Sequence, residues 1–355
     1  MISSPPYPFV LHASTSSLSF FLTMAAPSEP PLPKYLQDEN LTDECRELLR
    51  SLPSEKGWLS TFLHLFQGFW YGTRHMNGVL YTQLQFKAQD SDVLLVTTPK
   101  SGTTWLKAIL FALLNRSRYL EPHKKLDHPL LQKNPHDLVP SLELGLYVED
   151  PNPDLSSFTS PRLFATHLSH VSLPDSVKDS KCKLVYLCRN PKDTFVSLWH
   201  FTNKLRLKEM GTNTLEETFD KFCRGVSSNG PYWDHVLGYY KASLEMPHKV
   251  LFLKYEEMTE KPSEQLKRLA GFLGCPFSED EEANGGVDEI LRLCSFDNLS
   301  KLEVNRSGKL PTGEENRLFF RKGEVGDWVN YLTPEMIERL DRITKEKFRG
   351  SGLKL

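Results

Sequence analysis

The chain has 355 residues, 39% of them hydrophobic and 25% charged, and its formal net charge is −2 at pH 7. This composition is typical of a globular protein with a substantial core, and the length suits one large α/β domain or two ordinary ones. A net charge close to zero excludes bulk attraction to nucleic acid or to an anionic membrane, so we expect neither as a partner. Any anion site must therefore be local.

The six cysteines are scattered, without a C-x-x-C pair or a closely spaced histidine. This pattern predicts reduced thiols in the core of an intracellular protein rather than a disulfide framework or a zinc site. The residues concerned are Cys45, Cys182, Cys188, Cys223, Cys275 and Cys294.

Residues 1–33 are rich in Ser and Pro and contain no Lys or Arg. The apolar piece at 18–24 is too short to span a bilayer, and the segment lacks the basic start of a secretory signal. Met24 is a second candidate start. We predict a disordered extension at 1–33, a domain at 34–355 and a cytoplasmic location, with an organellar address as the alternative.

Two segments with helix-like patterns of charge and leucine follow, at 39–51 and 54–67, and Pro53 separates them. An aromatic cluster at 66–71 precedes Gly72. Such a cluster is either core or part of a small-molecule pocket.

An apolar run at 93–96 leads into a tight turn with Lys100, Gly102 and several hydroxyls, and then into a helical run at 106–114. A helix that begins near Ser101 leaves its first N–H groups free, and its dipole favours an anion there. This predicts a strand, a phosphate-binding loop and a helix. Ordinary Ser/Thr capping is the alternative, whereas a Walker A loop is excluded because Lys100 precedes the glycine.

Residues 117–155 contain six prolines and no clear periodicity. A segment of this length without regular structure is unusual unless it covers a functional site. We therefore predict a lid or a pocket wall.

Further apolar runs at 162–166, 182–188 and 249–254 predict strands, and helical patterns at 194–205 and 262–273 follow two of them. This alternation favours one α/β domain with a mainly parallel central sheet flanked by helices. His167, Arg189 and Tyr255 each come directly after a strand. Since ligands bind outside the carboxyl ends of parallel strands, we expect these groups to share one site with Lys100.

Arg189 stands where a nucleoside triphosphatase commonly presents an Asp for Mg²⁺. A guanidinium suits a phosphate held without metal, and Ser197 is close enough in sequence to reach the same group. The alternative is an ordinary cap before the turn at Pro191.

Residues 297–318 are polar, contain Gly308, Pro311 and Gly313, and predict a mobile loop. Arg321, Lys322 and Gly323 then combine two cations with a residue that lets backbone donors approach a ligand; a solvated charge pair is the alternative. A closing helix is predicted at 334–348, with a proline in its first turn.

Three of these segments, 99–105, 189–197 and 321–328, resemble the cytosolic sulfotransferases in the expected order, as does Thr166-His167-Leu168. The resemblance covers about residues 70–348 and is to the plant-type members. It implies a P-loop-like sulfotransferase fold and transfer of a sulfonate from 3′-phosphoadenosine 5′-phosphosulfate (PAPS), without a metal, to a hydroxyl of a small, largely apolar acceptor. Flavonoids, hydroxyjasmonate, brassinosteroids and desulfoglucosinolates are acceptors in such families, which places the chain in plant secondary metabolism.

The resemblance also implies roles for individual residues. His167 would be the general base, which suits the near-neutral pKa of an unperturbed histidine, and Lys100 would stabilise the leaving phosphate. The donor would be bound at its 5′-phosphate by Lys100, Ser101, Gly102, Thr103 and Thr104, at its nucleoside by Trp105, Tyr255, Ser295 and Phe296, and at its 3′-phosphate by Arg189, Ser197, Arg321, Lys322 and Gly323.

The sequence departs from the family pattern at a few positions. Ala165 stands where many animal members have Lys, Ser169 stands where Pro is common, and the Lys-Thr-Val-Glu dimer motif of animal members is not evident at 331–338. The oligomeric state stays open. A nucleotide-dependent kinase and a catalytically silent nucleotide-binding protein are the rival functions, and candidate walls of the acceptor pocket are Trp70, Tyr147 and His200.

Overall fold

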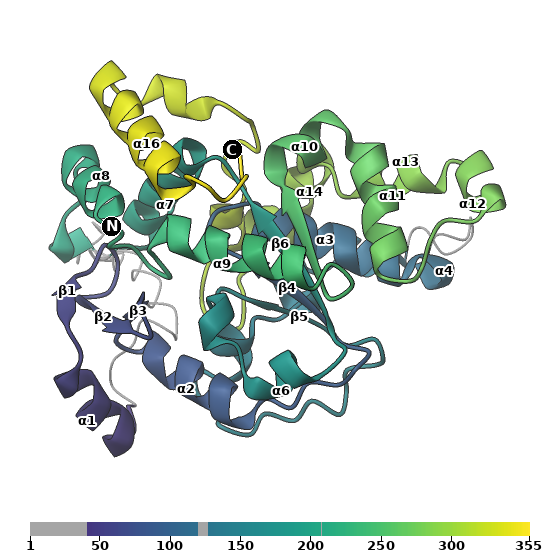
Figure 1. Ribbon diagram of the computed structural model, residues 1–355. Helices are drawn as coiled ribbons and strands as arrows, with labels where there is room; N and C mark the ends of the chain where they lie inside the picture. The colour runs from purple at the N-terminus through teal and green to yellow at the C-terminus, as the bar shows by residue number, and fades with distance from the viewer. Residues whose placement is uncertain (1–40, 120–126, 207) are drawn as a thin grey trace, which may run out of the picture. The chain divides into compact units, whose positions relative to one another are not determined.

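The computed structural model describes residues 41–119, 127–206 and 208–355, so the predicted extension at 1–33 lies outside the described part (Figure 1). Its centre is a sheet of four parallel strands in the order β5-β4-β6-β7. The strands are β4 (Val93–Thr97), β5 (Leu163–Thr166), β6 (Lys183–Cys188) and β7 (Val250–Lys254). All four predicted strands are present, and the predicted fold class is confirmed.

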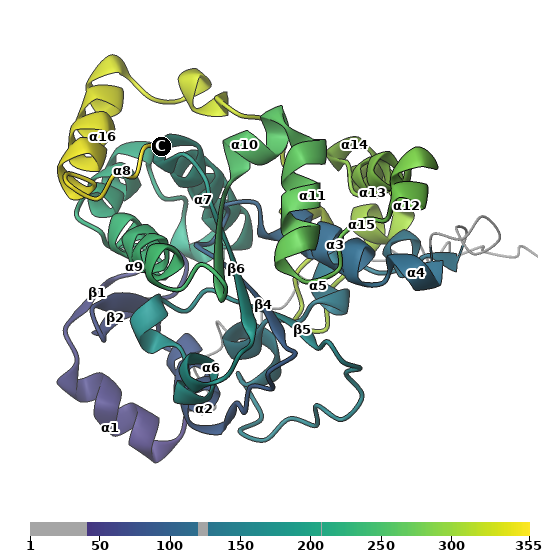
Figure 2. The same cartoon turned by 45° about the vertical axis from the view of Figure 1, so that its right-hand side comes forward.

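Side chains of β4 alternate between two hydrophobic clusters, one on each face of the sheet: Leu94 and Val96 join one cluster, Val93 and Leu95 the other. Figure 2 shows helices on both sides of the strands. The first cluster includes residues of α1 (Asp43–Ser51), α2 (His75–Gln85), α6 (Asp175–Asp179), α7 (Pro191–Leu205), α8 (Leu215–Cys223), α9 (Tyr232–Glu245) and α16 (Pro334–Lys347). The second includes residues of α3 (Thr103–Leu114), α10 (Tyr255–Glu260), α11 (Pro262–Phe272), α13 (Gly286–Leu293) and α14 (Phe296–Lys301).

Short elements complete the described chain. They are the helices α4 (Arg116–Tyr119), α5 (Pro135–Leu138), α12 (Glu279–Ala283) and α15 (Glu303–Ser307), and the single turns η4 (Pro129–Leu131), η5 (Leu142–Leu146), η6 (His170–Ser172), η7 (Lys208–Met210), η8 (Asn316–Phe319) and η9 (Asp327–Asn330).

The helix predicted at 54–67 is wrong. This part of the chain forms an antiparallel sheet of β1 (Ser54–Lys56), β2 (Phe62–Phe66) and β3 (Phe69–Gly72). Gln67 and Gly68 join β2 to β3 with φ angles of 51° and 83°. Two consecutive positive φ angles are typical of a tight hairpin turn, which sets the strands in register and overrides the helix-like spacing of leucines.

The mobile loop predicted at 297–318 is also wrong, because this segment contains α15 and most of α14. Buried amides connect it to its surroundings: Asn134 donates to Asn305 Oδ1 at 2.8 Å, and Asn316 donates to the Val304 carbonyl at 2.8 Å. Leu299 packs in the core, but these amide contacts have no apolar period, so a search for hydrophobic periodicity could not find the segment.

The strand order fixes where a ligand can bind. The chain leaves β4 for β5 on one side and continues to β6 on the other, so the crossovers diverge at β4. Sheets with this order bind ligands at the carboxyl ends of the strands that flank the divergence. Residues 98–102 and Arg189 follow β4 and β6 at these ends.

Candidate active site

A cavity of about 680 Å³ opens at this edge of the sheet. Its size is that of a small-molecule site. The predicted site residues that line it are Lys100, Gly102, Thr103, Thr104, Trp105, His167, Arg189, Ser197, Tyr255, Ser295, Phe296, Arg321, Lys322 and Gly323. Ser101 does not line it, because its hydroxyl is fully buried against Thr98 Oγ1 at 2.6 Å.

The wall of the cavity includes part of the segment predicted as a lid or wall, among it Asp137, Ser141 and Leu144–Leu146. Its residues 120–126 lie outside the described part of the chain. The three walls guessed from sequence, Trp70, Tyr147 and His200, are not among the lining residues. The aromatic ring of Tyr147, for example, is buried against Phe86 in the core.

The loop after β4 presents backbone donors to the cavity. Leu106 is the first residue after the turn whose N–H reaches a carbonyl of its own helix, that of Gly102, at 3.0 Å. The N–H groups of Thr103, Thr104 and Trp105 therefore have no intrahelical partner. Gly102 has a φ of 106°, and a Cβ there would lie 2.7 Å from the Tyr255 ring, so only glycine permits this approach.

Lys100 lies at the centre of this loop in the left-handed region, with a φ of 69°. This conformation is unfavourable for a residue with a side chain, and it directs Nζ over the ring of Phe201, 4.0 Å from the centroid. Burial, together with the charges of Arg321, Arg189 and Lys204, lowers the pKa of Lys100 to about 7. An anion in the cavity would favour the charged form of Lys100 and so raise this pKa.

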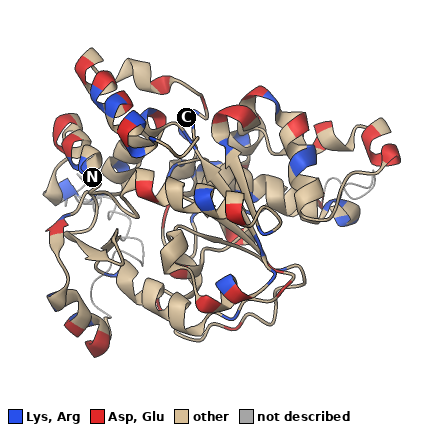
Figure 3. Cartoon of the chain, in the orientation of Figure 1, with Lys and Arg blue, Asp and Glu red and all other residues tan. Residues whose placement is uncertain are grey.

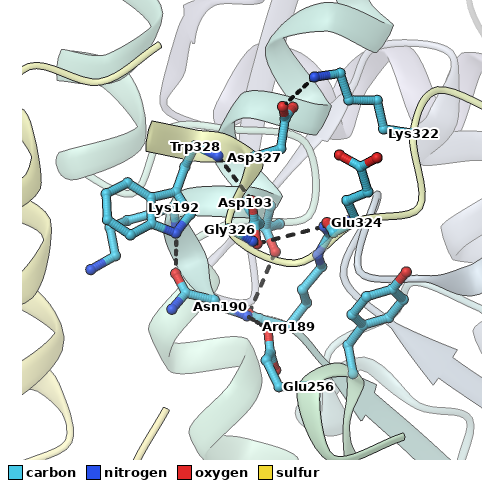
Figure 4. Close-up of polar contacts among 12 residues, drawn as sticks. Arg189, Asn190, Lys192, Asp193, Glu256, Lys322, Glu324, Gly326, Asp327 and Trp328 are labelled. Atoms are coloured by element: carbon cyan, nitrogen blue, oxygen red, sulfur yellow. Dashed lines mark hydrogen bonds and ion pairs between the residues drawn. The ribbon is translucent and has the colours of Figure 1, made fainter. Parts of the chain in front are cut away.

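Arg189 is buried at the end of β6, where Asn190 caps α7. One of its terminal nitrogens donates to the Glu324 carbonyl and lies 3.6 Å from Asp193 Oδ2 (Figure 4). Its guanidinium lies 4.5 Å from the Tyr255 ring centroid. Its Nε has no hydrogen-bond partner among the described residues. A buried donor of this kind is costly unless a ligand completes it.

Asp193 connects α7 to the C-terminal loop. Its carboxylate accepts from the N–H of Gly326 at 2.8 Å and from that of Trp328 at 3.2 Å (Figure 4). Asp327, in the same loop, forms ion pairs with Arg321 and, at 2.6 Å, with Lys322. Burial raises the pKa of Asp327, but hydrogen bonds from Lys322 and Arg321 outweigh this and lower it to about 2.

Arg321 repeats the pattern of Arg189, since its Nε is also buried without a partner among the described residues. Gly323 adopts a φ of 71°, and a Cβ there would lie 2.6 Å from the Phe296 ring. Its carbonyl accepts from Tyr255 Oη at 2.9 Å. Arg189 and Arg321 thus line one cavity with Lys100, although the three residues come from distant segments.

The positive charge of the site is confined to the cavity. Figure 3 shows basic and acidic residues mixed along the surface elements, for example on α16. This distribution agrees with the near-zero net charge and with an anion site that is confined to the cavity.

His167 follows β5 and is fixed by its backbone and its ring. Glu143 accepts from its N–H at 2.7 Å, and the ring Nδ1 lies 2.7 Å from the Thr97 carbonyl. Because a carbonyl only accepts, Nδ1 carries the proton and Nε2 has a free lone pair, without a partner among the described residues. Burial lowers the pKa of His167 to about 3, so the ring is neutral near pH 7.

Sequence reasoning missed several residues of the site. No pattern in the sequence marks Glu143 or Asp193, because each holds in place a candidate site residue or loop that lies far from it along the chain. Lys107 and His136 also line the cavity. Lys107 had a signal, since it is the one charged residue of the apolar helix α3.

The part of the chain that the structure describes contains no helix long and apolar enough to cross a membrane, and no group of three His, Cys, Asp or Glu side chains suited to a metal ion. All six cysteines are free thiols, four of them buried.

Comparison with known proteins identifies the family. Residues 90–352 match the model of the sulfotransferase domain. The chain is 54% identical over 327 residues to cytosolic sulfotransferase 12 of Arabidopsis thaliana, covering 92% of this chain and 98% of the relative, and 52% identical over 320 residues to cytosolic sulfotransferase 5, covering 90% and 98%.

Solved structures give the same result. A sulphotransferase of Arabidopsis thaliana is 48% identical, with a TM-score of 0.72 over 92% of this chain and 100% of that one. A mouse sulfotransferase complexed with PAP is 30% identical, with a TM-score of 0.63 over 81% and 95%. The chain belongs to the sulfotransferase family and is a transferase of the cytosolic group, as the resemblance of segments 99–105, 189–197 and 321–328 implied.

Proposed function

We propose that this protein transfers the sulfonate of PAPS to a hydroxyl of a small, largely apolar acceptor. The observation that carries the proposal is the convergence of three cations, Lys100, Arg189 and Arg321, on one cavity. A donor with phosphates at both ends would balance their charges. The PAP bound to the mouse relative, which is PAPS without its sulfonate, supports the same nucleotide here.

In this proposal PAPS supplies the sulfonate, and the chain supplies binding and proton transfer. The free N–H groups at the start of α3 and the Lys100 ammonium hold the 5′-phosphate. Arg189, Ser197 and the segment from Arg321 to Gly323 hold the 3′-phosphate. Trp105 and Tyr255, whose ring centroids lie 5.3 Å apart, contact the nucleoside together with Ser295 and Phe296.

His167 acts as the general base through Nε2. Its neutral state near pH 7 leaves that lone pair free to take the proton of the acceptor hydroxyl as the oxygen attacks sulfur. Glu143 and Thr97 hold the ring in place, and this fixed orientation is what proton transfer in an in-line reaction requires. The ammonium of Lys100 stabilises the charge that develops on the leaving phosphate.

Replacing His167 with Gln tests this assignment. We expect PAP to bind the variant within about twofold of the wild type by calorimetry, while turnover with labelled PAPS and a panel of phenols falls by about 10²–10⁴-fold, the usual contribution of a general base. The exposed His248→Gln serves as a matched control. Unchanged turnover in H167Q would remove His167 from its role, and absence of PAP binding to the wild type would refute the donor site.

The rival functions give different results in the same assays. A kinase would consume ATP and lose activity with a chelator, whereas we expect sulfonate transfer to persist in EDTA. A silent nucleotide-binding protein would bind PAP and sulfonate none of the phenols.

A further inference from the structure

Lys107 is a buried cation that lines the cavity on the side where we propose that the acceptor binds. The proposed reaction assigns no role to this side chain. It lies one helical turn after Thr103 and therefore on the same face of α3. Thr103 Oγ1 contacts Thr97 Oγ1 at 2.7 Å, and this hydroxyl lies 3.1 Å from His167 Nδ1. Lys107 is also close enough to the predicted general base for its charge to contribute to the lowered pKa of His167.

The ammonium of Lys107 is incompletely satisfied. The side chain is 1% exposed, and its Nζ has one hydrogen bond among the described residues, to His136 Nδ1 at 3.1 Å. An ammonium has three donors, and no described carboxylate lies within ion-pair distance of it. Glu143, Asp137 and Glu314 act on it only at longer range. Leaving buried donors unpaired is costly, which favours a partner supplied from the cavity.

His136 is held so that it orients Lys107. Its Nε2 bonds to Thr104 Oγ1 at 2.9 Å, and its ring lies 4.1 Å from that of Phe319, centroid to centroid. With Nδ1 accepting from Lys107, the imidazole fixes the position of the ammonium without cancelling its charge. Burial lowers the pKa of Lys107 to about 7, and an oxygen that accepts from it would favour the charged form.

We infer that Lys107, oriented by His136, donates a hydrogen bond to a second oxygen of the acceptor, separate from the hydroxyl that is sulfonated. The pocket then selects phenols and alcohols that carry a carbonyl, carboxylate or further hydroxyl oxygen over those with a hydrocarbon at that place. This inference rests on the proposed function, since it assigns the acceptor side of the same cavity.

A matched pair of ligands tests it. 6-Acetyl-2-naphthol and 6-isopropenyl-2-naphthol have nearly the same shape, but only the first has a second oxygen, and that oxygen accepts without donating. We expect the acetyl compound to bind the wild type, saturated with PAP, about tenfold more tightly by calorimetry, the effect of one hydrogen bond to a charged group. Lys107→Met should reduce the ratio to near one, and the surface variant Lys133→Met should leave it unchanged.

Comparing the affinity ratio of the two naphthols between the wild type and K107M cancels the effect of the acetyl group on the acidity of the naphthol, because that effect is present in both proteins. Equal affinities in the wild type, a ratio unchanged in K107M, or no binding of the acetyl compound would each overturn the inference. The ratio of the two ligand affinities in the wild type tests the inference even if the K107M variant fails to fold.

Measurements of turnover distinguish a failure of the proposed function from a failure of the inference about Lys107. If neither naphthol nor any other phenol is sulfonated from PAPS, the proposed function fails, and the affinity ratio, measured with and without PAP, still decides the role of Lys107. If K107M slows sulfonation of both naphthols equally and leaves the affinity ratio intact, Lys107 acts at the reacting oxygen and the second-oxygen contact is refuted.

Discussion

Asp193→Asn should loosen the C-terminal loop that carries Arg321 to Gly323. The carboxylate accepts from two backbone N–H groups, those of Gly326 and Trp328, and one of its oxygens lies 3.6 Å from the buried Arg189. An asparagine can accept from one of these N–H groups, but its own amide donor then faces the other. Arg189 keeps the Glu324 carbonyl and the Tyr255 ring but loses its counter-charge.

The size of the effect follows from these contacts. Breaking a buried ion pair by removing one partner commonly costs about 3–5 kcal/mol. We take the lower end, about 3 kcal/mol, because Arg189 retains its other contacts. If the loop opens locally, this corresponds to roughly 150-fold faster amide exchange.

Hydrogen exchange measured by mass spectrometry on peptides spanning 319–331 tests this value. Saturating PAP should restore much of the protection, because opening would then have to break the proposed phosphate contacts. Asp341→Asn is the matched control: Asp341 also pairs with a cation of α7, Lys192 at 2.6 Å, but its side chain is 58% exposed, so the loss should stay below about 1 kcal/mol. Equal exchange in D193N and the wild type would show that Asp193 does not hold the loop.

Two further predictions concern the nucleotide. A bound dianionic phosphate raises the pKa of Lys100 from about 7, so above that pH the complex holds one more proton than the free protein. PAP affinity, measured by calorimetric titration, should therefore fall up to tenfold per pH unit from about pH 7.5 to 9.5. Lys100→Arg stays protonated and should abolish this slope. A flat wild-type profile would contradict the lowered pKa. Gly323→Ala adds a Cβ 2.6 Å from the Phe296 ring at a positive φ, so it should weaken PAP binding about tenfold. Gly271→Ala, where the added Cβ meets open space, should leave PAP binding unchanged. Equal losses of affinity in the two variants would argue against the close packing at Gly323.

The sequence by itself determined the parallel sheet and most of the residues that we propose bind the nucleotide. Four apolar runs, each followed by a polar group, predict strands whose carboxyl ends meet at one edge, and the structure brings Lys100, His167, Arg189 and Tyr255 together there. This succeeds because a buried parallel strand needs a continuous apolar run, a signal carried by neighbouring residues. The hairpin at Gln67 and Gly68 was missed because its turn depends on two backbone angles that leucine spacing does not reveal.

Only the tertiary structure decided which groups support the site. Asp193 acts on amides more than 130 residues away, and Glu143 acts on a backbone N–H 24 residues away. Lys107 was visible as a lone charge in an apolar helix, but its imidazole partner comes from the proline-rich segment that sequence could describe only as a wall. Such contacts depend on how distant segments pack, and a local pattern holds no information about the side chain that will face it.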